Sequence, residues 1–118
     1  MIPQPKLIIE LRVVGKDKTV LERSVFEGEA DMSQQMKDRY ATVVGDAKGR
    51  VTVSRELSES DYGSGGKVFI SISLVCDQSE TGINEAVHLA THLSNSYVEK
   101  HHSELKDRLI ALGIFKKN

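Results

Sequence analysis

The stretch that decides the fold is a run in which apolar and polar residues alternate. It reads Lys67-Val68-Phe69-Ile70-Ser71-Ile72-Ser73-Leu74-Val75-Cys76. Successive side chains of a β-strand point to opposite faces, so a period of two is typical of a strand with one buried face. The even-numbered residues from Val68 to Cys76 form the apolar face. We therefore predict a strand that is half buried against a core.

The residues before this strand predict its hairpin partner. Val51, Val53 and Leu57 alternate with polar residues. The glycine-rich segment 62–66, which reads Tyr62-Gly63-Ser64-Gly65-Gly66, lies between the two stretches and suits a hairpin loop. We expect this hairpin to lead directly into a helix at Glu80.

A second hairpin is predicted at the start of the chain. Residues Lys6 to Val14 are rich in β-branched and apolar side chains, and Thr19 to Phe26 form the returning strand. The turn is expected at Gly15 to Lys18. Asp31 and Gln34 then form a capping-box pattern that predicts the start of a helix.

The middle of the chain allows two interpretations. Met32 to about Val43 favours a helix, whereas Tyr40 to Val44 has strand propensity, so residues 40–49 are either the end of a helix or a fifth strand. With the helix, the order is hairpin, helix, hairpin, helix. This order predicts one α+β domain over residues 1–118, with an antiparallel sheet of about four strands and helices packed on one face.

The last third of the chain predicts one long helix from Glu80 to Leu112, ended by Gly113. A straight helix of this length measures about 50 Å. A rounded domain of this size has a radius of gyration of only about 13–14 Å. We therefore expect the helix to break or to extend beyond its sheet, with uncovered apolar residues that form an oligomer interface. These residues are Leu105, Leu109, Leu112, Ile114 and Phe115.

Composition limits the classes of function. The 118 residues include 16 Lys and Arg and 17 Asp and Glu, which gives a formal net charge of −1. This balance excludes general electrostatic attraction to nucleic acid or anionic lipid, although a local basic patch remains compatible with it. The single cysteine, Cys76, cannot form an intrachain disulfide. The start of the chain lacks a signal-peptide core, and the apolar runs are too short to span a bilayer, so we expect a cytoplasmic protein.

Three patterns resemble catalytic or ligand sites only in part. Gly63 to Lys67 is followed by a strand, whereas a phosphate loop leads into a helix. His88 and His92 stand four residues apart on the long helix, a spacing that allows a metal with Glu85 or Glu99, but the buried face leaves them on the solvent side. Cys76 is expected to be a buried, inert thiol. We predict no enzyme activity, no metal and no cofactor.

The leading functional hypothesis is that the central hairpin binds single-stranded nucleic acid. Such binding needs cations for the phosphates and aromatic faces on which bases can stack. The hairpin and its open sheet face supply four basic and two aromatic candidates, which are Lys48, Arg50, Arg55, Lys67, Tyr62 and Phe69.

The alternative is a protein–protein module, either an inhibitor of a host factor or a subunit of a larger assembly. The apolar stripe on the last helix and the lack of net positive charge favour it. A third hypothesis is a small anionic ligand bound at the glycine loop, in a pocket completed at an oligomer interface.

Residues 50–100 carry a resemblance to known proteins. Val51-Thr52-Val53-Ser54-Arg55, Ser60-Asp61-Tyr62-Gly63-Ser64 and the strand ending at Cys76, followed by an acidic helix start, resemble a pattern in small uncharacterised phage and prophage proteins. The resemblance implies an accessory protein of a virus or mobile element. It supplies no known functional residues.

Overall fold

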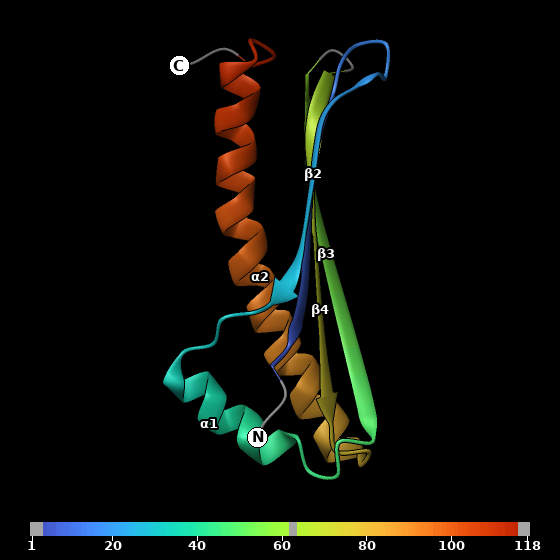
Figure 1. Ribbon diagram of the computed structural model, residues 1–118, viewed down its shortest axis with the longest axis vertical. Helices are drawn as coiled ribbons and strands as arrows, with labels where there is room; N and C mark the ends of the chain where they lie inside the picture. The colour runs from blue at the N-terminus through green and yellow to red at the C-terminus, as the bar shows by residue number, and fades with distance from the viewer. Residues whose placement is uncertain (1–3, 62–63, 116–118) are drawn as a thin grey trace.

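Four antiparallel strands form one sheet, and a long helix lies along one side of it (Figure 1). The structure is a computed structural model that describes residues 4–61 and 64–115. In chain order its elements are β1 (Lys6–Val14), β2 (Val20–Glu29), α1 (Gln34–Val43), β3 (Gly49–Asp61), β4 (Ser64–Cys76) and α2 (Glu80–Ala111). The strand order is β2–β1–β4–β3. The predicted α+β class and the order of elements are confirmed.

The two sides of the sheet differ in what covers them. Val68 and Ile70 of β4 point to the side that carries α2, here called the helix side, and both are fully buried. The opposite, open side carries Phe69 with its neighbours Glu10 and Glu56 across the sheet. α2 packs mainly on β4 and β3 and only slightly on β1. The apolar core therefore lies mainly between α2 and the strands β3 and β4, and Leu7 and Val13 of β1 extend it.

The long helix neither breaks nor outruns the sheet, so that expectation was wrong. It assumed a rounded domain, whereas the molecule is 49 Å long and has a radius of gyration of 16.9 Å. β3 and β4 have 13 residues each, which is about 43 Å of strand at 3.3 Å per residue. The 32 residues of α2 span about 48 Å. Helix and sheet match because both are unusually long.

The apolar residues at the end of α2 are mostly sheltered within one protomer. Leu105 and Leu109 are fully buried, which corrects the expectation that they would be uncovered. Ile114 and Phe115 are half-buried against the same core, and Leu112 is exposed. An oligomer interface at these residues stays a prediction. Uncovered apolar surface was the reason for expecting it, and this reason no longer applies to Leu105 and Leu109.

The ends of α1 settle the ambiguous middle of the chain. Ser33 is the N-cap, since its Oγ accepts a hydrogen bond of 3.2 Å from the Met36 amide. The predicted cap at Asp31 was therefore wrong by two residues. The helix continues to Val43, and the next strand, β3, begins only at Gly49. Residues 40–43 are therefore the end of a helix, as favoured, and residues 40–48 form no fifth strand.

The glycines of the central hairpin serve close packing. Gly65 and Gly66 belong to β4 and not to a loop. A Cβ atom on Gly66 would lie 2.5 Å from Leu105 Cδ1, and one on Gly65 would overlap the carbonyl oxygen of Glu59. These glycines let the helix and the neighbouring strand approach β4, so they do not form a phosphate loop. Tyr62 and Gly63 lie outside the described residues.

Two turns are joined at the end of the molecule where α2 begins. The Asp77 carboxylate accepts hydrogen bonds from the amides of Asp46 and Ser79, both of 3.2 Å. The Asp46 carboxylate in return accepts from the Gln78 amide at 3.2 Å. Hydrogen bonds from Ser79, and then from Asp46, lower the pKa of Asp77. The connection between α1 and β3 is thereby fixed to the start of α2.

Candidate functional site

A groove lies between α2 and the β1–β2 hairpin on the helix side of the sheet. Its floor is apolar: Leu7 is buried, and Ile9 and Leu11 are half-buried. The strand register places Phe26 opposite Ile9 and Ser24 opposite Leu11, so β2 forms the outer rim. The hollow measures about 400 Å³. It exists because α2 packs on the other two strands.

One stripe of α2 forms the second wall of the groove. Tyr97, His101, Glu104 and Arg108 follow at intervals of four, three and four residues, which puts them on the same face of a helix. The Tyr97 and His101 rings stack with their centroids 6.3 Å apart. His101 Nδ1 lies 2.8 Å from Glu104 Oε2. These contacts hold the wall side chains in place.

Polar contacts cross the groove near both ends. At one end the Tyr97 hydroxyl accepts a hydrogen bond of 2.7 Å from the Asp31 amide. At the other end Arg108 forms an ion pair with Glu22 of β2, and its Nε donates to Glu22 Oε2 at 3.1 Å. A neighbouring hollow of about 540 Å³ shares Leu11, Ser24 and Glu104 with the first. The two hollows therefore lie next to each other between α2 and β2, and together they are called the groove.

The rim of the groove exposes a large aromatic side chain. Phe26 is 53% exposed, although it stands beside the apolar floor. Its ring lies over Gly28, where an added Cβ would be 2.7 Å from the ring Cζ. An exposed aromatic ring next to an apolar hollow is typical of binding surfaces, because its burial stabilises a complex.

The groove is acidic as well as apolar. One lining cation, Arg108, is paired with Glu22, and His101 lies beside Glu104. The carboxylates that line the two hollows are Glu22, Glu29, Asp31, Glu104 and Asp107. This charge favours ligands with basic groups and disfavours phosphates.

The predicted nucleic-acid residues are divided between the two sides of the sheet. Arg50 and Lys67 lie on the open side with Phe69, as expected. Arg55 lies opposite Ile70 on the helix side, where its Nε donates to Asn95 Oδ1 at 2.7 Å. Its placement in one cluster with the others was therefore wrong. The sequence held the clue, because Arg55 shares the parity of Val51 and Val53 and not of the polar face.

Carboxylates accompany the cations of the open side. Lys67 Nζ lies 2.9 Å from Glu56 Oε1. Glu10 pairs with both Arg12, at 2.9 Å, and Arg23, at 3.2 Å. The open side is thus a mixed surface and not a basic one. Of the other candidates, Lys48 lies in the turn before β3 and Tyr62 lies outside the described residues.

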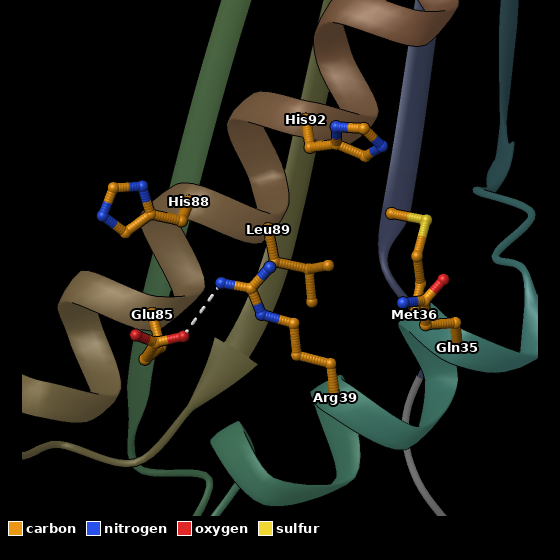
Figure 2. Close-up of a pocket in the computed structure, with 7 residues that line it drawn as sticks. All are labelled: Gln35, Met36, Arg39, Glu85, His88, Leu89 and His92. Atoms are coloured by element: carbon orange, nitrogen blue, oxygen red, sulfur yellow. Dashed lines mark hydrogen bonds and ion pairs between the residues drawn. The ribbon is translucent and has the colours of Figure 1, made fainter.

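The two histidines of the metal hypothesis line a different hollow, between α1 and α2. This cleft of about 750 Å³ is also lined by Arg39, whose Nη2 lies 3.1 Å from Glu85 Oε2. Figure 2 shows the rings of His88 and His92 pointing in different directions, on either side of the Arg39–Glu85 pair. Within residues 4–61 and 64–115, no group of three or more His, Cys, Asp or Glu side chains is placed to hold a metal ion.

Cys76 is fully buried, as predicted. Burial raises the pKa of its thiol, and the nearby Asp77 and Asp46 carboxylates add to this effect. A thiol that keeps its proton is a poor nucleophile.

The groove was missed at the level of sequence. The strands were predicted from Lys6 to Val14 and from Thr19 to Phe26, but nothing in the sequence showed that one face of this hairpin would stay partly uncovered. The spacing of Tyr97, His101, Glu104 and Arg108 was visible, yet only the sheet order shows that this stripe faces β2. Phe26 was identified only as the end of a strand.

No family model, curated protein or solved structure matches this chain. In the described part of the chain, no helix combines the length and the apolar character needed to cross a membrane. The function must therefore be argued from the geometry of the groove and the sheet.

Proposed function

We propose that the protein is a non-enzymatic protein-binding module whose groove takes up an apolar segment of a partner protein with basic residues along its edges. The apolar floor supplies the contact area, and the carboxylates around it select the basic partner. Such a groove recognises a segment that has apolar side chains on one side only. This proposal keeps the protein–protein alternative from the sequence analysis. It differs in the binding surface, which is the groove and not the apolar stripe at the end of α2.

The observation that carries the proposal is the exposure of Phe26 beside the floor formed by Ile9 and Leu11. Complete burial of a phenylalanine side chain stabilises a complex by about 1.5–3 kcal/mol. The contacts at Tyr97 and Arg108 hold the walls before any ligand arrives. A preformed site loses less conformational entropy on binding than a flexible one does.

Single-stranded nucleic acid stays the alternative, and it concerns the open side. Arg50, Lys67 and Phe69 remain there as candidates, although Glu10 and Glu56 reduce the positive charge. The origin in a virus or mobile element, implied by the resemblance over residues 50–100, is likewise a proposal and is independent of which surface binds.

A direct test uses a short fluorescein-labelled peptide in which leucine and lysine alternate, followed by fluorescence anisotropy. We expect the wild-type protein to bind it. Phe26→Ser should weaken binding at least tenfold, which corresponds to about 1.4 kcal/mol. The matched control is Ile8→Ser, since Ile8 is an exposed apolar residue on the opposite side of the neighbouring strand.

The charge of the probe separates the hypotheses. A peptide with glutamate in place of lysine should bind weakly or not at all. Equal binding of both peptides, or no effect of Phe26→Ser, would contradict the proposal. Labelled oligothymidylate provides the other arm: binding that falls with salt and with Phe69→Ala would favour the nucleic-acid alternative.

A further inference from the structure

β2 is an edge strand of the sheet. It has one strand neighbour, β1, and α2 packs on the other half of the sheet. Natural edge strands are blunted with charged side chains, especially lysine, or with proline, bulges or a covering element, since unpaired backbone groups attract another strand. The sequence Val20–Glu29 contains neither lysine nor proline, and its charged residues are of both signs, with Arg23 beside three glutamates. Val25 and Phe26 are 46% and 53% exposed. The opposite edge, β3, lies beneath α2.

The hydrogen-bond pattern shows which β2 residues are unpaired along this edge. The Ala30 amide donates to the Pro5 carbonyl at 2.9 Å, so this pair belongs to the hydrogen-bonded set of the β1–β2 ladder. Hydrogen-bonded and non-hydrogen-bonded pairs alternate along antiparallel strands. Following the register from Ala30, the even-numbered residues of β2 bond to β1. The amides and carbonyls of Arg23, Val25 and Glu27 therefore point away from the sheet.

We propose that the β2 edge binds the β2 edge of a second copy of this chain, antiparallel and with the two-fold axis at Val25. This register sets Val25 against Val25 of the other copy. It also sets Arg23 against Glu27 of the other copy, once on each side of the axis. All of these residues have their backbone groups free, so each pair can exchange two hydrogen bonds. Opposite charges and apolar pairs directly across strands are the stabilising combinations.

The register at Val25 is favoured over its neighbours by the pairing of Val25. Shifting the axis by one residue toward Ser24 sets Arg23 against Val25 and removes the charge pair. Shifting it toward Phe26 keeps a charge pair, Arg23 with Glu29, but sets Val25 against Glu27. Larger shifts bring Arg23 against Arg23, or Glu27 against Glu27, and like charges directly opposite are destabilising. Of these registers, the one at Val25 both pairs Arg23 with a carboxylate and keeps Val25 against an apolar residue.

The joined edge would extend the groove. On the helix side the same register sets Phe26 beside Ser24 of the other copy, a small residue that leaves room for the ring. The two copies of α2 would lie on the outer strands of a continuous sheet, with the two grooves meeting over its centre. The dimer goes beyond the proposed function and does not rest on it, since it is derived from the backbone and charges of β2 alone.

The first experiment is sedimentation velocity over a micromolar to submillimolar range. We expect the wild type to form a dimer of twice the 13.1 kDa of the chain. Glu27→Arg places arginine against Arg23 of the other copy and should weaken the dimer at least tenfold. The double variant Arg23→Glu with Glu27→Arg should restore it. A monomer at every concentration, or a double variant as weak as the single one, would overturn the proposal.

The second experiment tests the register. In the hydrogen-bonded pair at the axis the two Cα atoms lie about 5.5 Å apart, which a disulfide can bridge. Val25→Cys should therefore cross-link under mild oxidation. The control Glu27→Cys should not, because Glu27 faces Arg23 of the other copy, and the second cysteine, at position 27 of that copy, lies four residues away from that position. The buried Cys76 should not compete. Equal cross-linking at both positions would indicate random collision and would exclude this register.

The dimer and the groove can fail separately. Val25→Pro removes an outward amide and should give a monomer without breaking the β1–β2 ladder. If this monomer still binds the leucine–lysine peptide, the proposed function stands without the dimer. If the wild type is a dimer that ignores the peptide, the dimer stands without the proposed function.

Discussion

The central strand β4 and the edge strand β2 of the same sheet differ in how far their helix-side residues are buried. On β4 the helix-side residues Val68, Ile70 and Ile72 are fully buried, whereas Phe26 on β2 is more than half exposed. The reason is width. A helix is about 10 Å across, and strands lie about 4.8 Å apart, so one helix covers about two strands. One long helix on a four-stranded sheet therefore leaves the far edge strand, β2, and part of β1 uncovered.

The second helix does not close the gap. α1 packs beside the first turns of α2, at one end of the molecule (Figure 1). The Tyr40 hydroxyl at this end donates to the Val75 carbonyl at 2.9 Å. The covered half is therefore closed and cross-connected, and the open half keeps apolar surface available for a partner. We expect stability to depend on the first half and binding on the second.

The largest expected effect is at the covered half. Leu105→Ala should lower the free energy of unfolding by about 2–5 kcal/mol, because Leu105 is fully buried and its truncation leaves a cavity. Leu112→Ala, at a residue that is 42% exposed on the same helix, should change it by less than about 1 kcal/mol. Urea denaturation measures both. Equal losses would mean that the end of α2 is not packed on the sheet.

A smaller effect is expected from a pair of glycines, one in each half. Gly66→Ala should destabilise the protein by about 1–3 kcal/mol, because its Cβ would lie 2.5 Å from Leu105 Cδ1 and 2.8 Å from the Arg12 carbonyl oxygen. Gly28→Ala should cost little, since the Phe26 ring that it meets is exposed and free to turn. Thermal unfolding compares the two. A larger loss at Gly28 would show that the rim of the groove is rigid.

The smallest effect is a dependence on acid pH at the end of the covered half. The pKa of Asp77 is lowered in the folded state, so its hydrogen bonds stabilise the fold above the ordinary value of about 3.9. This contribution is lost as the pH falls through the lowered pKa. In Asp77→Asn the loss of stability below about pH 4 should be shallower than in the wild type. Unfolding midpoints from pH 7 downward test this, and identical acid profiles would contradict it.

Much of the fold could be predicted from periodicity. The switch from a period of two to a period of 3.6 at Glu80 placed the long helix within a residue of its observed end. Two of the errors had local signals. The helix is capped by Ser33, whose Oγ accepts a hydrogen bond from the Met36 amide, and not by Asp31. Arg55 was grouped by its charge instead of by its parity on the strand.

The amino-acid sequence by itself determined the two hairpins, the long helix and the apolar face of β4, because these depend on side-chain periods and turn residues within short segments. Tertiary structure decided which apolar faces are covered. The strand order β2–β1–β4–β3 and the path of α2 placed Leu105 in the core and left Phe26 outside it. Leu105 lies on the face of α2 that packs against the sheet, whereas Phe26 lies on the edge strand that α2 does not cover.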